Sequence, residues 1–278
     1  MLFKINIIFL TILFLTLNVS FAFPQSAEEW DKKGLDLYNQ GKYEEAINCF
    51  DQALTINPEL VSAWNNMGNA YMKLDKYANA IIFYERALEC DPAYLEALNN
   101  KGIVLRLTGR LQEALVCHCK VLELDATYVD AWYNRGNVLY DMDKFEEAAA
   151  CYTKALEFDN TNSDYWYNKG LAIGSLGLYN DALIYINKAI ELDPKNPQAW
   201  VSRGCVLNRM GSYEEAIKCL DKALEISPQD KRIWNARGVV FYEQKRYGEA
   251  MKCFDRALEI DSDFKKAKEN KEKILYNL

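Results

Sequence analysis

The residues with the clearest capacity for chemistry are the single histidine and its two cysteine neighbours, in the run Cys117-His118-Cys119. Imidazole and thiolate groups are the ligands that zinc prefers in proteins. Consecutive residues of a helix point about 100° apart, so these three side chains cannot converge on one ion. No second Cys/His pair at zinc-site spacing accompanies them. The sequence therefore predicts no metal site.

Other catalytic patterns are equally weak. The segment Gly174-Ser175-Leu176-Gly177 lacks the strand-turn-helix context of a nucleophile elbow. The chain contains no glycine loop of the Walker or dinucleotide-binding type. A formal net charge of −7 argues against a general attraction to nucleic acid. We therefore expect no enzymatic activity, no cofactor and no nucleic-acid partner.

The elements that position these residues follow the pattern of one stretch, Val61–Tyr94. Its first half places Trp64, Gly68 and Tyr71 at helical spacing. Its second half carries a second helical stripe, formed by Tyr77, Ala80, Ile81, Tyr84, Ala87 and Leu88. A short turn around Asp75 separates the halves, and Pro92 ends the second because proline lacks an N–H donor. The stretch predicts a helix, a turn and a second helix.

The same pattern recurs every 34 residues without an insertion. The tryptophans in phase are Trp30, Trp64, Trp132, Trp166, Trp200 and Trp234. The glycines in phase are Gly34, Gly68, Gly102, Gly136, Gly170, Gly204 and Gly238. The turn positions are Gly41, Asp75, Gly109, Asp143, Gly177, Gly211 and Lys245. Seven units are predicted, at 27–60, 61–94, 95–128, 129–162, 163–196, 197–230 and 231–264.

On these residues the sequence resembles the tetratricopeptide repeat family, whose 34-residue helix-turn-helix pattern it matches. The resemblance implies an all-α fold, a right-handed α-solenoid of stacked helix-turn-helix repeats. The in-phase glycines are expected to let the second helix of each unit approach closely at its in-phase alanine, as at Gly136 and Ala148.

The repeat phase also interprets the histidine and the cysteines. His118 takes the position that Phe50, Tyr84, Tyr152, Leu220 and Phe254 fill in other units, so we expect it to be a packing residue. Five of the cysteines, Cys49, Cys117, Cys151, Cys219 and Cys253, share one repeat position. Neighbouring helices are spaced about 8–10 Å apart, too far for a disulfide. We therefore predict free thiols that pack as small apolar groups.

The two ends of the chain depart from the repeats. Residues 1–22 carry Lys4, an apolar run and the segment Ser20-Phe21-Ala22, which indicate a signal peptide cleaved after Ala22. The alternative is an uncleaved membrane anchor, since the apolar character is nearly long enough to span a bilayer. The protein is accordingly expected to be exported (secreted, periplasmic or at the cell surface), or anchored in the membrane by this segment. Residues 265–278 predict a capping helix, with a basic binding tail as the alternative.

Function is expected on the face of each first helix that the apolar stripe does not use. By resemblance to the family, the first helices line a concave groove, and the asparagines Asn66, Asn100, Asn134 and Asn168, 34 residues apart, are similar to ladders that hold an extended peptide by its backbone. An amide both donates and accepts hydrogen bonds, so it can pair with any peptide group. The predicted groove residues are Asn65, Asn66, Asn69, Asn99, Asn100, Tyr133, Asn134, Asn137, Tyr140, Tyr167 and Asn168. The alternative is that asparagine is merely tolerated there and was copied with the repeats.

A second stripe is basic and directly precedes the repeat glycines, as Lys33, Lys101, Arg135, Lys169, Arg203 and Arg237. We expect these side chains to pair with acidic residues of the second helices, and keep a track for polyanions as the alternative. The sequence as a whole predicts a non-catalytic scaffold that binds an extended peptide or a partner protein. The alternative is a structural component that self-associates through its ends or its convex face.

Overall fold

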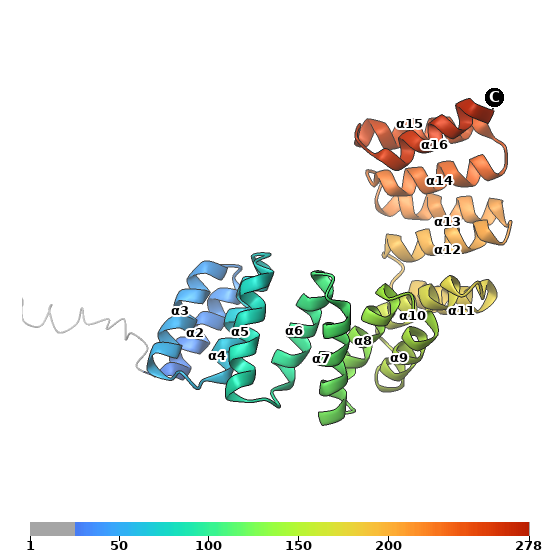
Figure 1. The fold of residues 1–278 in the computed structure, drawn as a ribbon. Coiled ribbons are helices and arrows are strands. Elements are labelled where there is room, and N and C mark those ends of the chain that lie inside the picture. The colour runs from blue at the N-terminus through green and yellow to red at the C-terminus, as the bar shows by residue number, and fades with distance from the viewer. Residues whose placement is uncertain (1–25, 278) are drawn as a thin grey trace, which may run out of the picture. The chain divides into compact units, whose positions relative to one another are not determined.

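The computed structural model describes residues 26–277, and in this range all regular secondary structure is α-helix. They follow one another as antiparallel pairs joined by tight turns (Figure 1). The first helices of the pairs are α2 (Ala27–Asn39), α4 (Val61–Lys73), α6 (Leu95–Leu107), α8 (Val129–Asp141), α10 (Ser163–Ser175), α12 (Pro197–Arg209) and α14 (Lys231–Glu243). The second helices are α3 (Tyr43–Ile56), α5 (Tyr77–Cys90), α7 (Leu111–Leu124), α9 (Phe145–Phe158), α11 (Tyr179–Leu192), α13 (Tyr213–Ile226) and α15 (Tyr247–Ile260). The last helix, α16 (Lys265–Asn277), stands after the seventh pair.

The predicted fold class, an all-helical repeat of hairpins, is confirmed. Every turn position named from the sequence has a left-handed backbone, with φ of 77° to 79° at the glycines, 56° and 57° at Asp75 and Asp143, and 62° at Lys245. That conformation ends one helix and lets the next return beside it. The chain forms two compact units that divide between Asn100 and Lys101, inside α6.

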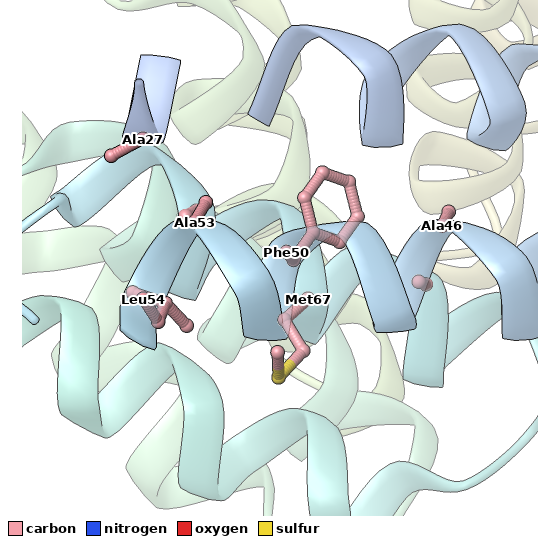
Figure 2. Packing of buried hydrophobic residues seen from close by; sticks show 8 residues of the cluster. Ala27, Ala46, Phe50, Ala53, Leu54 and Met67 are labelled. Carbon is pink, nitrogen blue, oxygen red and sulfur yellow. The ribbon is translucent and has the colours of Figure 1, made fainter. Parts of the chain in front are cut away.

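The apolar core of each repeat lies between the two helices of its hairpin and the hairpin that follows. Figure 2 shows one such cluster, in which Phe50 of α3 and Met67 of α4 are buried among Ala27, Ala46, Ala53 and Leu54. Buried alanines and larger apolar side chains recur along the helices at the helical spacing that the sequence indicated. Each hairpin therefore buries its apolar face only together with its neighbour, as stacked repeats do.

The close helix approach at several repeat glycines involves a large side chain in addition to the alanine position that was expected. A Cβ added at Gly68 would lie 2.5 Å from Tyr84 Cε1, and one at Gly136 would lie 2.6 Å from Tyr152 Cε1. These rings belong to the large residue four positions after the in-phase alanine. At these two positions the glycine makes room for a large side chain of the second helix, whereas at Gly170 and Gly204 an added Cβ would also lie 3.3 and 3.2 Å from the carbonyl oxygens of the in-phase Ala182 and Ala216, as expected.

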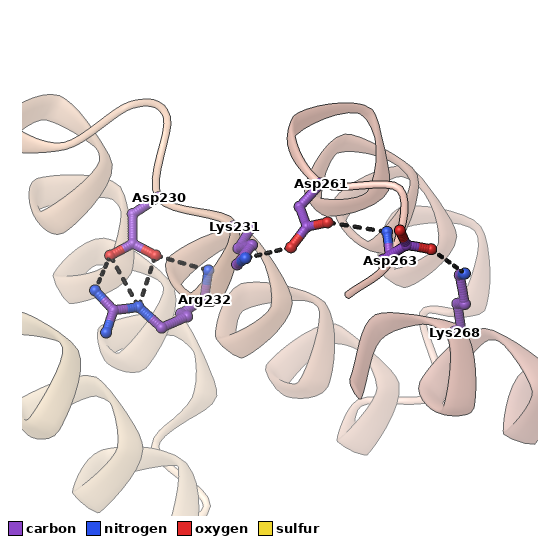
Figure 3. A network of polar contacts seen from close by, with 6 residues as sticks. All are labelled: Asp230, Lys231, Arg232, Asp261, Asp263 and Lys268. Carbon is purple, nitrogen blue, oxygen red and sulfur yellow. Dashed lines mark hydrogen bonds and ion pairs between the residues drawn. The ribbon is translucent and has the colours of Figure 1, made fainter. Parts of the chain in front are cut away.

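The C-terminal hairpin is fixed by polar contacts as well as by its core. Figure 3 shows Lys231 Nζ paired with Asp261, the backbone N–H of Asp263 donating to Asp261 Oδ1 (2.9 Å), and Lys268 Nζ near Asp263 Oδ1 (3.4 Å). Asp230 accepts from the backbone N–H of Arg232 (2.8 Å) and caps α14. The Lys231–Asp261 pair joins the start of α14 to the loop before α16. Hydrogen bonding from Lys231 lowers the pKa of Asp261.

The last helix packs one face onto the array. Ala267 and Ile274 of α16 are fully buried beside Phe254, while Leu275 is 63% exposed. The predicted signal peptide or anchor, residues 1–22, lies outside the described residues. Between residues 26 and 277, no helix is both long and apolar enough to span a bilayer.

Candidate functional site

The first compact unit, which ends at Asn100, contains several of the asparagines predicted to bind a peptide. Their side chains form hydrogen bonds with other side chains of the protein. Asn66 Nδ2 donates to Asp31 Oδ1 (3.0 Å), joining α4 to α2. Asn100 Nδ2 donates to Asn65 Oδ1 (3.2 Å) and to Asn69 Oδ1 (3.0 Å), joining α6 to α4. Asn65 and Asn99 are each only 5% exposed. In this unit the amide donors therefore connect consecutive first helices.

The predicted groove residues of the second unit make similar connections. Asn168 Nδ2 donates to the Tyr133 hydroxyl (3.0 Å), which joins α10 to α8. The hydroxyls of Tyr167 and Ser202 share a hydrogen bond (3.2 Å), as do those of Tyr140 and Ser175 (3.3 Å). Asn134 and Asn137 are half-buried on α8, and Asn137 Oδ1 accepts from the Tyr152 hydroxyl (2.9 Å). Burial raises the pKa of Tyr133 and Tyr167, so both stay neutral.

Most of the amide contacts between first helices share one separation, because the partners lie 35 residues apart in Asp31–Asn66, Asn65–Asn100, Tyr133–Asn168 and Asn235–Asn270. That separation is one repeat plus one residue, so each bond connects a first helix to the next first helix or, for Asn235–Asn270, to α16. The regular spacing of the asparagines thus has a structural use. A role for them in peptide binding stays a prediction.

A hollowed surface that the sequence reading missed runs along α12. One hollow, of about 500 Å³, lies against α8, α10 and α12 and is lined by Tyr140, Gly174, Ser175, Ser202, Cys205 and Arg209, among others. A second, of about 380 Å³, lies against α12 and α14 and is lined by Cys205, Asn208, Arg209, Tyr213, Ala236, Val240 and Glu243. Cys205 and Arg209 line both hollows. We call the two together the α12 trough.

Small residues create the α12 trough. Gly174 stands where the other first helices carry Tyr38, Met72, Arg106, Tyr140, Asn208 and Tyr242. Ala236 stands where α4, α6, α8 and α10 carry the in-phase asparagines. The signal was present in the sequence as departures from the repeat pattern. It could not be interpreted without the structure, because a missing side chain opens a hollow only if no neighbour fills the space.

The polar groups of the α12 trough are not all satisfied within the protein. Asn208 Oδ1 is buried and has no hydrogen-bond partner. Arg209 has no hydrogen-bond or ion-pair partner among residues 26–277. Cys205 reaches solvent but is crowded by protein atoms, and this desolvation raises the pKa of its thiol while nearby Arg209 acts in the opposite direction. The thiol is therefore neutral at neutral pH and is a poor nucleophile.

The chemical candidates from the sequence occupy packing positions. His118 is fully buried against Gly102, and neither ring nitrogen has a partner. The in-phase cysteines Cys49, Cys117, Cys151, Cys219 and Cys253 are all buried, as predicted, and no disulfide links any of the eight cysteines. Within residues 26–277, no group of three or more His, Cys, Asp or Glu side chains could hold a metal ion.

The basic stripe packs differently from the expectation. The charged groups of Lys33, Arg135, Arg203 and Arg237 lie 4.7, 5.7, 6.0 and 5.9 Å from the ring centres of the tryptophans three residues earlier. Arg237 does pair with Asp221 (2.8 Å), as expected. A cation over a tryptophan face is stabilised by the ring quadrupole. Four members of the stripe therefore pack on the repeated tryptophans, and Arg237 combines this contact with the expected acidic partner.

The comparisons with known proteins agree with this architecture. Models described as "TPR repeat" match residues 34–75, 102–143 and 204–245, and models described as "Tetratricopeptide repeat" match residues 61–94, 83–116, 129–162, 163–196, 185–218 and 232–264. Together these matches run without a break from residue 34 to residue 264. The chain belongs to the tetratricopeptide repeat family.

Solved tetratricopeptide repeat structures resemble this one. YrrB, described as "a TPR protein with an unusual peptide-binding site", is 26% identical, with a TM-score of 0.53 over 68% of this chain and 97% of YrrB. MamA is 27% identical, with a TM-score of 0.53 over 60% of this chain and 96% of MamA. A tetratricopeptide repeat protein from Parabacteroides merdae shares the fold at 20% identity, with a TM-score of 0.73 over 91% of this chain and all of that one. No curated protein sequence matches the chain. Such neighbours support a protein-interaction scaffold in general terms.

Proposed function

We propose that this tetratricopeptide repeat protein is a non-catalytic scaffold that binds an extended segment of a partner protein, and that the segment lies in the α12 trough. The observation that carries the proposal is the trough itself. It combines two adjoining hollows of about 500 and 380 Å³ with polar groups that no neighbour satisfies. Surfaces of this kind are typical of binding sites, which are concave and present a few polar groups that fix orientation.

The chemistry of the trough favours binding over catalysis. Its thiol, Cys205, has a raised pKa, and its hydroxyls at Ser175 and Ser202 are hydrogen-bonded to tyrosines rather than to a base. A nucleophilic serine or cysteine needs an adjacent base or a lowered pKa. The likeness to YrrB, whose description names a peptide-binding site, adds support for a peptide ligand.

The experiment that tests this proposal uses two matched cysteine variants. Purified full-length protein is immobilised and exposed to a synthetic library of N-acetylated hexapeptides, and retained peptides are identified by mass spectrometry. Cys205→Tyr places a ring where both hollows meet, so we expect it to reduce retention at least about tenfold, the effect of losing roughly 1.4 kcal/mol of binding free energy.

The control is Cys90→Tyr, because Cys90 is also an exposed cysteine on a helix, at the end of α5, and lines neither hollow of the trough. It should retain the same peptides as the wild type. Retention by Cys205→Tyr equal to that of the wild type would place binding elsewhere, and no retention of any peptide by the wild type would refute a peptide-binding scaffold of this kind.

A further inference from the structure

We infer that the α12 trough selects one pair of features in its peptide, a large apolar side chain seated over Gly174 and a neighbouring carboxylate paired with Arg209. The inference rests on the proposed function and adds the chemistry of the ligand. Within the described residues, three features of the trough support it: Gly174, which packing does not require, the unpaired guanidinium of Arg209, and the buried Asn208 Oδ1, which has no donor.

Packing does not explain Gly174. A Cβ at this position would meet only Ala182 Cβ at 3.6 Å and Val206 Cγ2 at 3.8 Å, which are ordinary van der Waals distances. At the repeat glycine of the same helix, Gly170, a Cβ would lie 2.7 Å from Ile186 Cγ1. Glycine in a helix is less favourable than alanine. The close approach of Ile186 thus requires a glycine at position 170, whereas the glycine at position 174 only leaves open space above the helix.

That space is suited to an apolar side chain. Its lining includes Leu171, Ile186 and Val206, and the last two are 0% and 9% exposed. The rim carries the hydrogen-bonded hydroxyls of Tyr140 and Ser175. An aromatic or long aliphatic side chain placed over Gly174 would be removed from water on the side of the helices. Burying such a side chain favours binding through the hydrophobic effect.

Arg209 supplies the charge at the end of the same hollow. Arginines on two other first helices are already paired, Arg106 with Asp141 (2.7 Å) and Arg237 with Asp221 (2.8 Å). Arg209 is exposed and has no ionic partner in the part of the chain that the structure describes. Because Arg209 is the last residue of α12, its positive charge also interacts favourably with the helix dipole. This interaction does not require the side chain to line both hollows. A planar guanidinium in this position matches a carboxylate.

The second hollow limits how acidic the ligand can be. Asn208 Oδ1 is buried there without a partner, so a backbone N–H of the peptide could satisfy it. Glu243 lines the same hollow, and its carboxylate repels a second acidic group. The expected ligand therefore carries one carboxylate beside its apolar residue, followed by neutral or basic residues toward α14.

The test uses the N-acetylated hexapeptide library in two arms, one with C-terminal amides and one with free C-terminal carboxylates. Wild-type protein should enrich peptides with Phe, Leu, Ile or Met next to Asp or Glu in the amide arm. Enrichment of an apolar residue next to the free C-terminus, in the second arm alone, would identify the chain end as the source of the carboxylate. Either result supports the inference.

Variants then separate the two features. Gly174→Met fills the hollow with the side chain that Met72 carries at this repeat position, and we expect it to weaken the best wild-type peptide at least about tenfold. Arg209→Gln should weaken it about five- to tenfold and remove the preference for a carboxylate. The matched control is Gly248→Met on α15, where an added Cβ meets nothing within 4 Å, and it should bind normally.

Each outcome bears on the inference. Circular dichroism checks that the variants fold, and Gly174→Ala provides a smaller change, with an intermediate loss expected, should Gly174→Met fail to fold. Peptides enriched without the apolar and acidic pair, or bound unchanged by Gly174→Met and Arg209→Gln, would overturn the inference and leave the proposed function standing. No enrichment at all would overturn both.

Discussion

His118 is a polar residue in an apolar position. It is completely buried over Gly102, at the place where other hairpins put Phe50 or Phe254 over their own glycines. Neither ring nitrogen has a hydrogen-bond partner. Desolvation, helped by the charge of Arg106, lowers the pKa of His118 from its ordinary value of 6.5 to about 4. The folded protein therefore holds this imidazole neutral over most of the accessible pH range.

The lowered pKa predicts a loss of stability in acid. The unfolded chain takes up a proton near pH 6.5 and the folded chain only near pH 4, so the unfolded state binds more protons between these values. The contribution of His118 to the free energy of unfolding is full above pH 6.5 and falls as the pH drops toward about 4. The whole loss is about 3 kcal/mol. His118→Phe should abolish it.

Hydrogen exchange of the α7 amides at pH 7 and pH 4.5 would measure this effect, with the variant compared with the wild type at each pH. The protection gained by His118→Phe should be larger at the lower pH. Tyr152→Phe is the control, since it changes the same position of the hairpin formed by α8 and α9 without altering a group that titrates in this window. An equal gain for His118→Phe at both pH values would contradict a buried neutral imidazole.

Among the elements, the turns show how far a pattern of single residues determines local structure. All seven turn positions named from the sequence have positive φ. Six carry glycine or aspartate, which tolerate this region, and the seventh is Lys245, with φ of 62°. The left-handed region costs an ordinary L-residue about 1–2 kcal/mol. Lys245 is thus the position at which the repeat pattern and the backbone disagree.

Replacing Lys245 with glycine should stabilise the protein. The expected gain is about 0.5–1 kcal/mol, because relief of the left-handed strain exceeds the larger entropy that glycine gives to the unfolded chain. A higher midpoint of thermal unfolding, followed by circular dichroism, would show it. Lys245→Ala removes the same side chain but keeps the strain, so it should give no gain. The reverse change at the equivalent position, Gly211→Lys, should lower the midpoint.

The helices and their order could be predicted from the sequence because a 34-residue period constrains them strongly. Apolar spacing placed both helices of each hairpin, and the turn residues placed their junctions. The partners of individual side chains were harder to predict. The pattern indicated that Gly68 faces a close neighbour, but only the structure shows that this neighbour is Tyr84 rather than Ala80.

The candidate site was predicted only in part, for a related reason. Asn66, Asn100 and Asn168 lie on the first helices as expected, yet their amides connect those helices through bonds between residues 35 apart. A repeat pattern shows which residues recur and does not show whether a recurring polar group faces a ligand or the next repeat. The α12 trough depends on what is missing at Gly174 and Ala236, and absent side chains leave no positive pattern to detect.

At the scale of the whole molecule, contacts between neighbouring helices dominate. Second helices pack on the first helix of the next hairpin, as α3 does on α4 and α13 on α14. First helices also touch the next first helix, as α12 does α14. In such an array stability is close to a sum of local terms, so damage at one end should stay local. The last hairpin then depends on α16, which covers its apolar face with Ala267 and Ile274.

Ile274 provides the test of this locality. The side chain is 0% exposed and lies in the core cluster of α15 and α16, so Ile274→Ala should cost about 2–4 kcal/mol of local stability. Hydrogen exchange should accelerate in α14, α15 and α16 and remain unchanged in α2 to α5. The adjacent variant Leu275→Ala removes a similar side chain, but one that is 63% exposed. It should change the free energy of opening measured by hydrogen exchange by less than about 0.5 kcal/mol. Faster exchange in α2 to α5 after Ile274→Ala would mean that the array unfolds as one cooperative body, because the effect of one terminal side chain would then extend far beyond the helices that pack against it.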